Sequence, residues 1–255
     1  MRKKTIIKVE NLHKRYNGNG FEAVRGISFE VYENEIFGLL GPNGAGKTTT
    51  VEMMEGLRGI TQGSIEILDI DVKKSKESLK EKIGVQLQSA AFFEQLTVIE
   101  TLDLFASFYK KNKDINQIID DFDLQDKKNF WVQKLSGGQK QRLSIGVAMV
   151  NDPEIVFLDE PTTGLDPQAR HHTWEIIQKL KKEGKTVIIT THYMEEAEVL
   201  CDRVGIMDEG KIIALDTPEK LIENLISKGF KKEKVRQLAD LEDVFLNLTG
   251  KTLRD

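Results

Sequence analysis

The chain has 255 residues, of which 39% are hydrophobic and 31% are charged, and its formal net charge is -4. This length supports one large domain with a real core and at most a modest appendage, and the composition excludes a disordered chain. The lysine-rich stretches are interleaved with Glu, so the chain carries no electrostatic footprint for nucleic acid. The single cysteine, Cys201, excludes an internal disulfide or a cysteine metal cluster and is expected to be a buried structural thiol.

The apolar runs are short. Runs such as 155–158 and 187–189 fall far below the roughly 20 residues needed to cross a bilayer. The opening MRKKTIIKVEN has none of the continuous hydrophobic region of a signal peptide. We therefore expect no membrane span and a cytoplasmic protein.

In chain order, strand patterns come first. β-branched and aromatic residues between turn formers predict strands at 6–10, 26–31 and 35–40. From Thr48 onward, helices alternate with short apolar strands. We expect a helix to about residue 57, a strand at 64–67, a helix from Ser78, and strands at 84–87, 155–158, 186–190 and 203–207. Such alternation predicts an α/β fold with a mostly parallel sheet and helices on both of its faces.

The interval 97–150 has no strand pattern. A capping box at Thr97 and Glu100 begins a stretch with apolar residues at helical spacing, namely Val98, Leu102, Phe105 and Tyr109. This pattern predicts a helical insert at about 89–150 within a domain of residues 1–216.

A C-terminal extension is expected over 217–255. Thr217 and Pro218 have the character of an N-cap and a first helical residue, and they predict short amphipathic helices. One face of these helices would carry Leu238, Leu241, Phe245 and Leu248. Packing on the same domain is the preferred interpretation, and a contact with a second copy or another partner is the alternative.

The segment GPNGAGKTT fits the phosphate-binding pattern G-x-x-x-x-G-K-[ST] and lies between an apolar strand and a helical stretch, as that motif requires. Its glycines let successive backbone N–H groups point at phosphates, and the following helix presents its positive end. Lys47 would add a charge at the β- and γ-phosphates, and the Thr48 hydroxyl is placed to bind Mg²⁺. The expected nucleotide site comprises Gly41, Pro42, Asn43, Gly44, Ala45, Gly46, Lys47, Thr48 and Thr49.

The strand pattern at 155–158 ends in two carboxylates, Asp159 and Glu160. A plain buried strand does not explain these acids. In phosphate-loop enzymes the first such Asp holds Mg²⁺, and Glu160 is then placed to polarise the attacking water as general base.

A second phosphate-handling segment is LSGGQ. Ser136 and Gln139 have capping-box spacing before a helix, so the simplest interpretation is a capped helix. Gly137 and Gly138 argue for more, because two glycines in a first helical turn are costly unless a ligand approaches closely. The chain already has a phosphate loop for its own nucleotide. We therefore infer that this helix end meets a γ-phosphate held by a second protomer.

Together these segments resemble the ATP-binding cassette (ABC) transporter ATPases over nearly the whole chain. The resemblance implies an ABC ATPase fold: a P-loop NTPase core, an N-terminal antiparallel β subdomain and the helical insert. It also implies site roles for four further residues. Tyr16 would stack on adenine, with Arg15 or Phe21 as alternatives, and Gln88 would link Mg²⁺ and the attacking water to the insert. Asp166, in Gly164-Leu165-Asp166, resembles the D-loop residue, and His192 resembles the switch histidine that senses the γ-phosphate.

The same resemblance implies a partner and a task. Within the family, IGVQLQ, PTTGLDPQAR and the ending LEDVFLNLTGKTLRD are similar to the bacterial branch that energises export of drugs or other hydrophobic compounds. ATP and Mg²⁺ would be the cofactors. A second copy or a homologous cassette and a separate membrane permease would be the partners, and the permease would hold the chain at the cytoplasmic face of the membrane. Phe92 and Phe93 would line the groove for the permease, or else belong to the core of the insert.

Two alternatives remain open. A soluble ABC ATPase of the iron–sulfur assembly type would use the same dimeric clamp without a permease. A small-molecule P-loop kinase would explain 41–49 but would leave LSGGQ and His192 without a role.

Overall fold

The computed structural model describes residues 3–16, 20–86, 92–230, 244 and 247–249. Two sheets organise these residues. The strands are β1 Thr5–Arg15, β2 Glu22–Tyr32, β3 Ile36–Leu40, β4 Gln62–Ile67, β5 Ile70–Asp71, β6 Ile83–Gln86, β7 Ile155–Asp159, β8 Thr186–Thr191, β9 Arg203–Asp208 and β10 Lys211–Asp216. The α-helices are α1 Lys47–Met54, α2 Lys76–Lys80, α3 Val98–Ala106, α4 Ile115–Asp121, α5 Gly137–Ala148, α6 Pro167–Lys182, α7 Met194–Leu200 and α8 Pro218–Ser227, with 3₁₀ turns at Gln125–Lys127 and Val132–Lys134.

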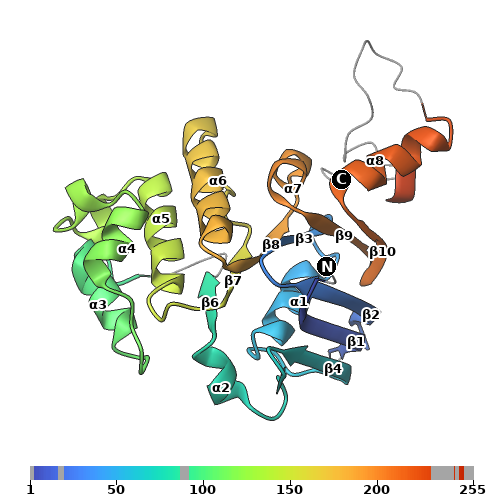
Figure 1. The fold of residues 1–255 in the computed structure, drawn as a ribbon, viewed down its shortest axis with the longest axis horizontal. Coiled ribbons are helices and arrows are strands. Elements are labelled where there is room, and N and C mark those ends of the chain that lie inside the picture. The colour runs from blue at the N-terminus through green and yellow to red at the C-terminus, as the bar shows by residue number, and fades with distance from the viewer. Residues whose placement is uncertain (1–2, 17–19, 87–91, 231–243, 245–246, 250–255) are drawn as a thin grey trace.

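The larger sheet has the strand order β10-β9-β3-β8-β7-β6. All neighbours in it are parallel except β10 with β9. The smaller sheet, β2-β1-β4-β5, is antiparallel throughout. The predicted α/β fold with an N-terminal antiparallel subdomain is therefore confirmed. Figure 1 shows that the antiparallel sheet and the helices α3, α4 and α5 lie on opposite sides of the larger sheet.

The central strands separate two hydrophobic cores. Side chains on a strand alternate between its faces, so Phe37 and Leu39 of β3 join the core beneath the antiparallel sheet and α1, whereas Ile36 and Leu40 join the core of the insert and of α6 and α7. Because both faces are covered, the five residues of β3 are all buried and read as a continuous apolar run. Phosphate-loop residues at the end of β3 are thus held on a rigid strand.

The capping signals are confirmed. Thr97 and Ser136 each close a capping box, at the starts of α3 and α5. Thr217 caps α8, with Pro218 in the first turn. The insert contains helices and 3₁₀ turns, apart from an isolated bridge between Thr97 and Trp131, as expected.

The C-terminal extension is described in part. In α8, Leu221 and Leu225 pack into the core of the main domain, as preferred above. Leu248 is 40% exposed, and the predicted positions Leu238, Leu241 and Phe245 lie outside the described residues. Cys201 is buried as expected, and burial raises the pKa of its thiol.

Two strands and several boundaries differ from the prediction. β5 and β10 were not expected, and β1 runs to Arg15 rather than ending at residue 10. The helix predicted to about residue 57 ends earlier, at Met54. β5 and β10 are edge strands, whose positions are fixed by pairing with β4 and β9 rather than by an apolar pattern of their own.

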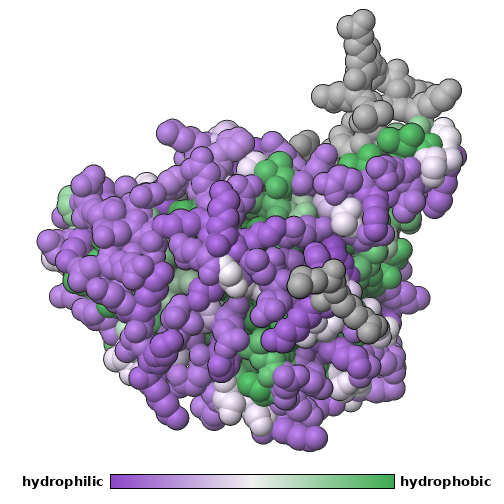
Figure 2. Space-filling view, viewed as in Figure 1, coloured by the Kyte–Doolittle hydropathy of each residue, from purple (hydrophilic) through white to green (hydrophobic). Residues whose placement is uncertain are grey.

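The surface is mainly hydrophilic on the face drawn in Figure 2, in keeping with the charged composition. Of the helices within the described ranges, none has both the length and the apolar character that a membrane crossing requires.

Candidate functional site

The phosphate loop joins β3 to α1, and two of its glycines have left-handed backbones. Gly44 has φ +83° and Gly46, the N-cap of α1, has φ +101°. A Cβ on Gly46 would lie 2.5 Å from the Ala23 carbonyl oxygen, whereas a Cβ on Gly44 would meet nothing within 4 Å. Gly46 is therefore required for close packing, and Gly44 borders open space where a phosphate could enter.

Lys47 begins α1 and is buried. Its Nζ donates to the carbonyl oxygens of Gly41, at 2.8 Å, and Pro42, at 3.0 Å. Burial lowers the pKa of the ammonium, and the nearby carboxylates of Glu160 and Asp159 oppose that shift. The backbone of the phosphate loop therefore holds the Lys47 ammonium in place within the loop.

Asp159 is the last residue of β7, at the same edge of the sheet as the phosphate loop. It accepts hydrogen bonds at Oδ1 from the hydroxyls of Thr190 and Thr48, the latter at 3.4 Å. Burial raises the pKa of its carboxyl, and the Glu160 charge adds to the rise, while both hydroxyls and Lys47 oppose it. The predicted neighbours Thr48 and Asp159 are thus in contact.

The chemistry of this cluster fits Mg²⁺. Thr48 and Asp159 offer a hydroxyl and a carboxylate, which are the hard oxygen donors that this ion prefers. Asp159 and Glu160 also place two carboxylates beside the single ammonium of Lys47, and such a surplus of acidic groups attracts a cation.

Glu160 has a left-handed backbone, with φ +49°, which is unusual for a residue with a side chain. Its N–H donates to the carbonyl and hydroxyl oxygens of Thr190, both at 3.1 Å. Its Oε2 accepts from the Thr163 hydroxyl at 3.1 Å, and its Oε1 lies 3.2 Å from Nδ1 of His192. The neighbouring strand therefore holds the backbone of Glu160, while the Thr163 hydroxyl holds its carboxylate beside the His192 ring.

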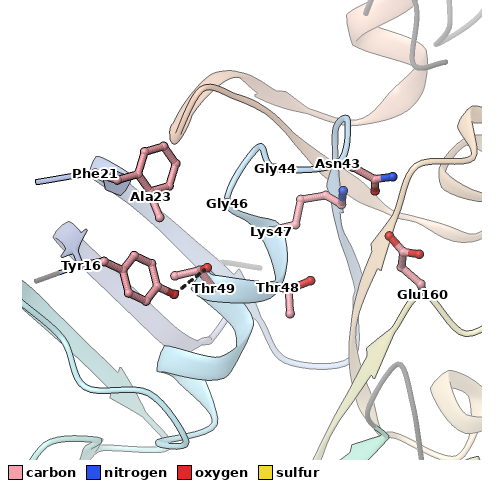
Figure 3. A pocket seen from close by; sticks show the side chains of 10 residues that line it. All are labelled: Tyr16, Phe21, Ala23, Asn43, Gly44, Gly46, Lys47, Thr48, Thr49 and Glu160. Carbon is pink, nitrogen blue, oxygen red and sulfur yellow. Dashed lines mark hydrogen bonds between the residues drawn. The ribbon is translucent and has the colours of Figure 1, made fainter. Parts of the chain in front are cut away.

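A cavity of about 220 Å³ runs from the phosphate loop to two aromatic rings (Figure 3). Tyr16 and Phe21 lie at one end and Glu160 at the other, with Lys47 between them. The Tyr16 hydroxyl is 3.4 Å from Oγ1 of Thr49. Both aromatic candidates for the base-binding end therefore border the cavity. The cavity is lined by Tyr16, Phe21, Ala23, Asn43, Gly44, Gly46, Lys47, Thr48, Thr49 and Glu160.

The helix start at Ser136 faces a different hollow. Ser136 Oγ accepts from the Gln139 N–H at 3.3 Å, and the Gln139 side chain accepts from the Ser136 N–H at 2.9 Å. A Cβ on Gly137 would meet nothing within 4 Å, whereas one on Gly138 would lie 2.9 Å from Cβ of Ala169 on α6. Gly138 thus has a packing reason within the chain, and Gly137 faces open space.

This second hollow, of about 690 Å³, also borders the segment before α6. Its lining residues are Ser136, Gly137, Gly138, Gln139, Arg142, Gly164, Leu165, Asp166, Gln168, Ala169 and His172. No lining residue is shared with the first cavity. Asp166 caps α6 by accepting from the Ala169 N–H at 2.9 Å. Gln88, expected near Mg²⁺, lies outside the described residues.

Sequence reasoning missed Thr190 and Thr163, which hold the two carboxylates in place. Thr190 is the register partner of Asp159 between the parallel strands β8 and β7. Parallel strands end at one edge of a sheet, so the sequence places Thr190, which ends the 186–190 pattern, at the same edge as Asp159. That β8 lies directly beside β7 is known only from the structure.

Known proteins match the part of the chain that holds these motifs. The ABC transporter family model matches residues 24–163, which is more than half of the chain. The chain belongs to the ABC transporter family. It is an ATPase of that family, and its phosphate loop, Asp159 and Glu160 all lie within the matched residues.

Individual relatives and solved structures of the ABC family support this membership. The chain is 39% identical over 225 residues to the linearmycin resistance ATP-binding protein LnrL of Bacillus subtilis, covering 86% of this chain and 72% of that one. It is 42% identical to the Nod factor export ATP-binding protein I of Burkholderia orbicola, covering 86% and 73%. The solved ATP-binding subunit of an ABC transporter superimposes with a TM-score of 0.81 at 26% identity, covering 96% and 99%. A dimeric post-hydrolysis state of the cassette MJ0796, bound to ADP and Pi, has a TM-score of 0.75 at 26% identity, covering 83% and 98%.

Proposed function

We propose that two copies of this ABC ATPase clamp two ATP molecules between them, hydrolyse them, and thereby drive a separate membrane permease that exports drugs or other hydrophobic compounds. The observation that carries the proposal is the division of the phosphate-handling residues between two hollows of one chain. The cavity at the phosphate loop is lined by the Lys47 ammonium and the Glu160 carboxylate but by no residue of the Ser136–Gln139 helix start. A facing copy would supply that helix start and complete the site.

In this proposal the chain's own residues divide the work. Backbone N–H groups of 41–49 and the Lys47 ammonium bind the β- and γ-phosphates. Thr48, Asp159 and Gln88 hold Mg²⁺, which would neutralise phosphate charge when bound. Glu160 polarises the attacking water, and His192, 3.2 Å from Glu160, contacts the γ-phosphate. Tyr16 stacks on the adenine.

The dimer supplies the remaining contacts. Ser136 and the open side of Gly137 meet the γ-phosphate of the facing copy, and Asp166 lies in the loop beside them. A helix N-terminus favours an anion because its first N–H groups and its dipole point outward. The solved dimer of MJ0796 bound to ADP and Pi supports this arrangement by analogy.

The permease contact is proposed at the edge of the insert. Phe92 packs edge-to-face on Phe105 at 6.0 Å between ring centroids, so it belongs in part to the insert's own core. Phe93 is 67% exposed and remains available to a partner. Relatives named for linearmycin resistance and Nod factor export support an export task, and the solved CbiO1 subunit, part of the CbiONQ complex, supports assembly with further subunits. The chain would then lie at the cytoplasmic face of the membrane.

Reconstitution tests this proposal. The chain would be co-expressed with a protein of about six hydrophobic spans encoded by a neighbouring reading frame, and the purified complex would be placed in lipid vesicles. We expect the two proteins to co-purify and ATP hydrolysis to rise when a transported compound is added. Hydrolysis by a chain that binds no multi-span protein would instead favour a soluble ABC ATPase.

A further inference from the structure

Glu196 lies on α7, outside the residues that line the nucleotide cavity, and is fully buried. Its Oε1 accepts hydrogen bonds from the Thr162 hydroxyl at 2.7 Å and from the Trp174 indole N–H at 3.0 Å. Burial raises the pKa of this carboxyl, and the hydroxyl of Thr191, Thr162 and the indole oppose the rise. An apolar side chain would pack α7 on α6 without the free-energy cost of burying a carboxyl group. The presence of a carboxyl group here therefore needs an explanation other than packing.

Both donors, Thr162 and Trp174, belong to the segment that follows Glu160 and continues into α6. Thr162 follows Glu160 by two residues, in the loop that leads to α6, and Trp174 lies on α6. Glu196 follows His192 by four residues. The two segments are therefore joined twice: at the site, where Nδ1 of His192 lies 3.2 Å from Oε1 of Glu160, and away from it, where Thr162 donates to Glu196.

We propose that Glu196 is a positioning residue for ATP hydrolysis: by accepting both donors, it fixes the loop after Glu160 against the segment that carries His192. Displacement of a reacting group by about 1 Å can cost about 100-fold in rate, so a second anchor between these segments has kinetic value. The inference rests on the roles proposed above for Glu160 and His192. It adds a group that lies outside the lining of the cavity at the phosphate loop.

Two substitutions separate acceptance of hydrogen bonds from the filling of space. Glu196→Met has a similar length but accepts neither donor, and Glu196→Gln keeps an oxygen that can accept both. At a temperature well below the unfolding transition, we expect Glu196→Met to lower kcat for ATP hydrolysis about tenfold while the Kd for ATP changes less than about twofold. Glu196→Gln should keep kcat within about twofold. Wild-type kcat in Glu196→Met would overturn the proposal.

A matched control is the adjacent residue. Glu195 is on the same helix and bonds Arg170 of α6 at 3.1 Å, but its side chain is 57% exposed. Glu195→Gln should leave kcat unchanged, because it loosens only the outer contact between the helices. If Glu196→Met fails to fold, Thr162→Val removes one donor with little change in shape. We expect it to lower kcat several-fold, and an unchanged kcat would overturn the proposal.

A double substitution tests the route of the effect. In a His192→Ala background, Glu196→Met should lower kcat no further, because the two changes remove the same arrangement. Equal losses in both backgrounds would show that Glu196 acts independently of His192. Wild-type kcat in His192→Ala alone would remove the proposed role of His192 and the inference with it. Wild-type kcat in Glu196→Met beside an impaired His192→Ala would remove the inference only.

Discussion

Nδ1 of His192 lies 3.2 Å from Oε1 of Glu160, although 31 residues separate the two in the chain. The contact arises because β7 and β8 are parallel neighbours, in which Asp159 pairs with Thr190, so the residues after both strands emerge at one edge of the sheet. The left-handed turn at Glu160 then directs its carboxylate toward the cavity. The two roles proposed above, His192 at the γ-phosphate and Glu160 at the attacking water, therefore fall on neighbouring side chains.

Glu160→Gln should bind ATP and hydrolyse it at least about 100-fold more slowly, because the amide cannot accept a proton from water. With hydrolysis blocked, an ATP-dependent dimer should accumulate. Light scattering after gel filtration, with and without ATP, measures the dimer, and phosphate release measures turnover. Glu154→Gln is the control. This residue directly precedes β7, at the end of the strand opposite Glu160, and its variant should behave as wild type. Wild-type turnover in Glu160→Gln would remove Glu160 from the role of general base.

Mixing two inactive variants should restore activity. In a dimer of one Ser136→Ala subunit and one Lys47→Ala subunit, one interface combines an intact phosphate loop with an intact helix start. We therefore expect hydrolysis well above that of either variant alone. Ser136→Ala also removes a helix cap, at a cost of about 1 kcal/mol, so Thr97→Ala, which breaks the capping box of α3, is the control for lost stability. A mixture no more active than its components would mean that the site is not shared between subunits.

Sequence reasoning succeeded where the signal was local. The capping boxes at Thr97 and Ser136 and the cap at Thr217 each depend on hydrogen bonds within about four residues, and all three are present. The phosphate loop was predicted from one continuous segment, and it lies between β3 and α1 as expected. In contrast, β10 was missed because none of its residues is fully buried and its place depends on pairing with β9.

The contacts that hold the site were less accessible to sequence reasoning. Thr190 beside Asp159 follows from the order of strands in the sheet, which the sequence does not state. The hydrogen bonds of Glu196 with Thr162 and Trp174 join α7 to α6 and the loop before it, and the spacing of these residues in the sequence does not predict them. Close approach of a ligand to Gly137 and Gly138 stays a prediction. Gly138 has a further reason within its own chain, because it packs closely on Ala169, whereas Gly137 faces open space.

Gly137→Ala should separate stability from dimerisation. An alanine there meets no atom within 4 Å in the single chain and restricts the unfolded state, so we expect the free energy of unfolding to rise by about 0.5 kcal/mol. The added methyl group would stand where the facing ATP approaches, so ATP-dependent dimerisation and hydrolysis should fall about tenfold or more. Urea unfolding and light scattering measure the two effects. A stable variant that dimerises like wild type would argue against close approach of a nucleotide at Gly137.

Glu55 should make the free energy of unfolding fall as pH rises from about 4.5 to 8. It is buried at the end of α1, and burial, with added repulsion from the carboxylates of Asp159 and Glu52, raises its pKa to about 8 from an ordinary 4.5. Between these values the folded chain keeps a proton that the unfolded chain has lost, so stability from this group is complete below pH 4.5 and is lost by pH 8. Glu55→Gln stays neutral, so its advantage over wild type in urea unfolding should grow by about 3 kcal/mol between pH 5 and pH 8. Glu66→Gln, on an exposed position of β4, should track wild type across the same range. A constant difference between Glu55→Gln and wild type would mean that Glu55 is ionised in the folded chain.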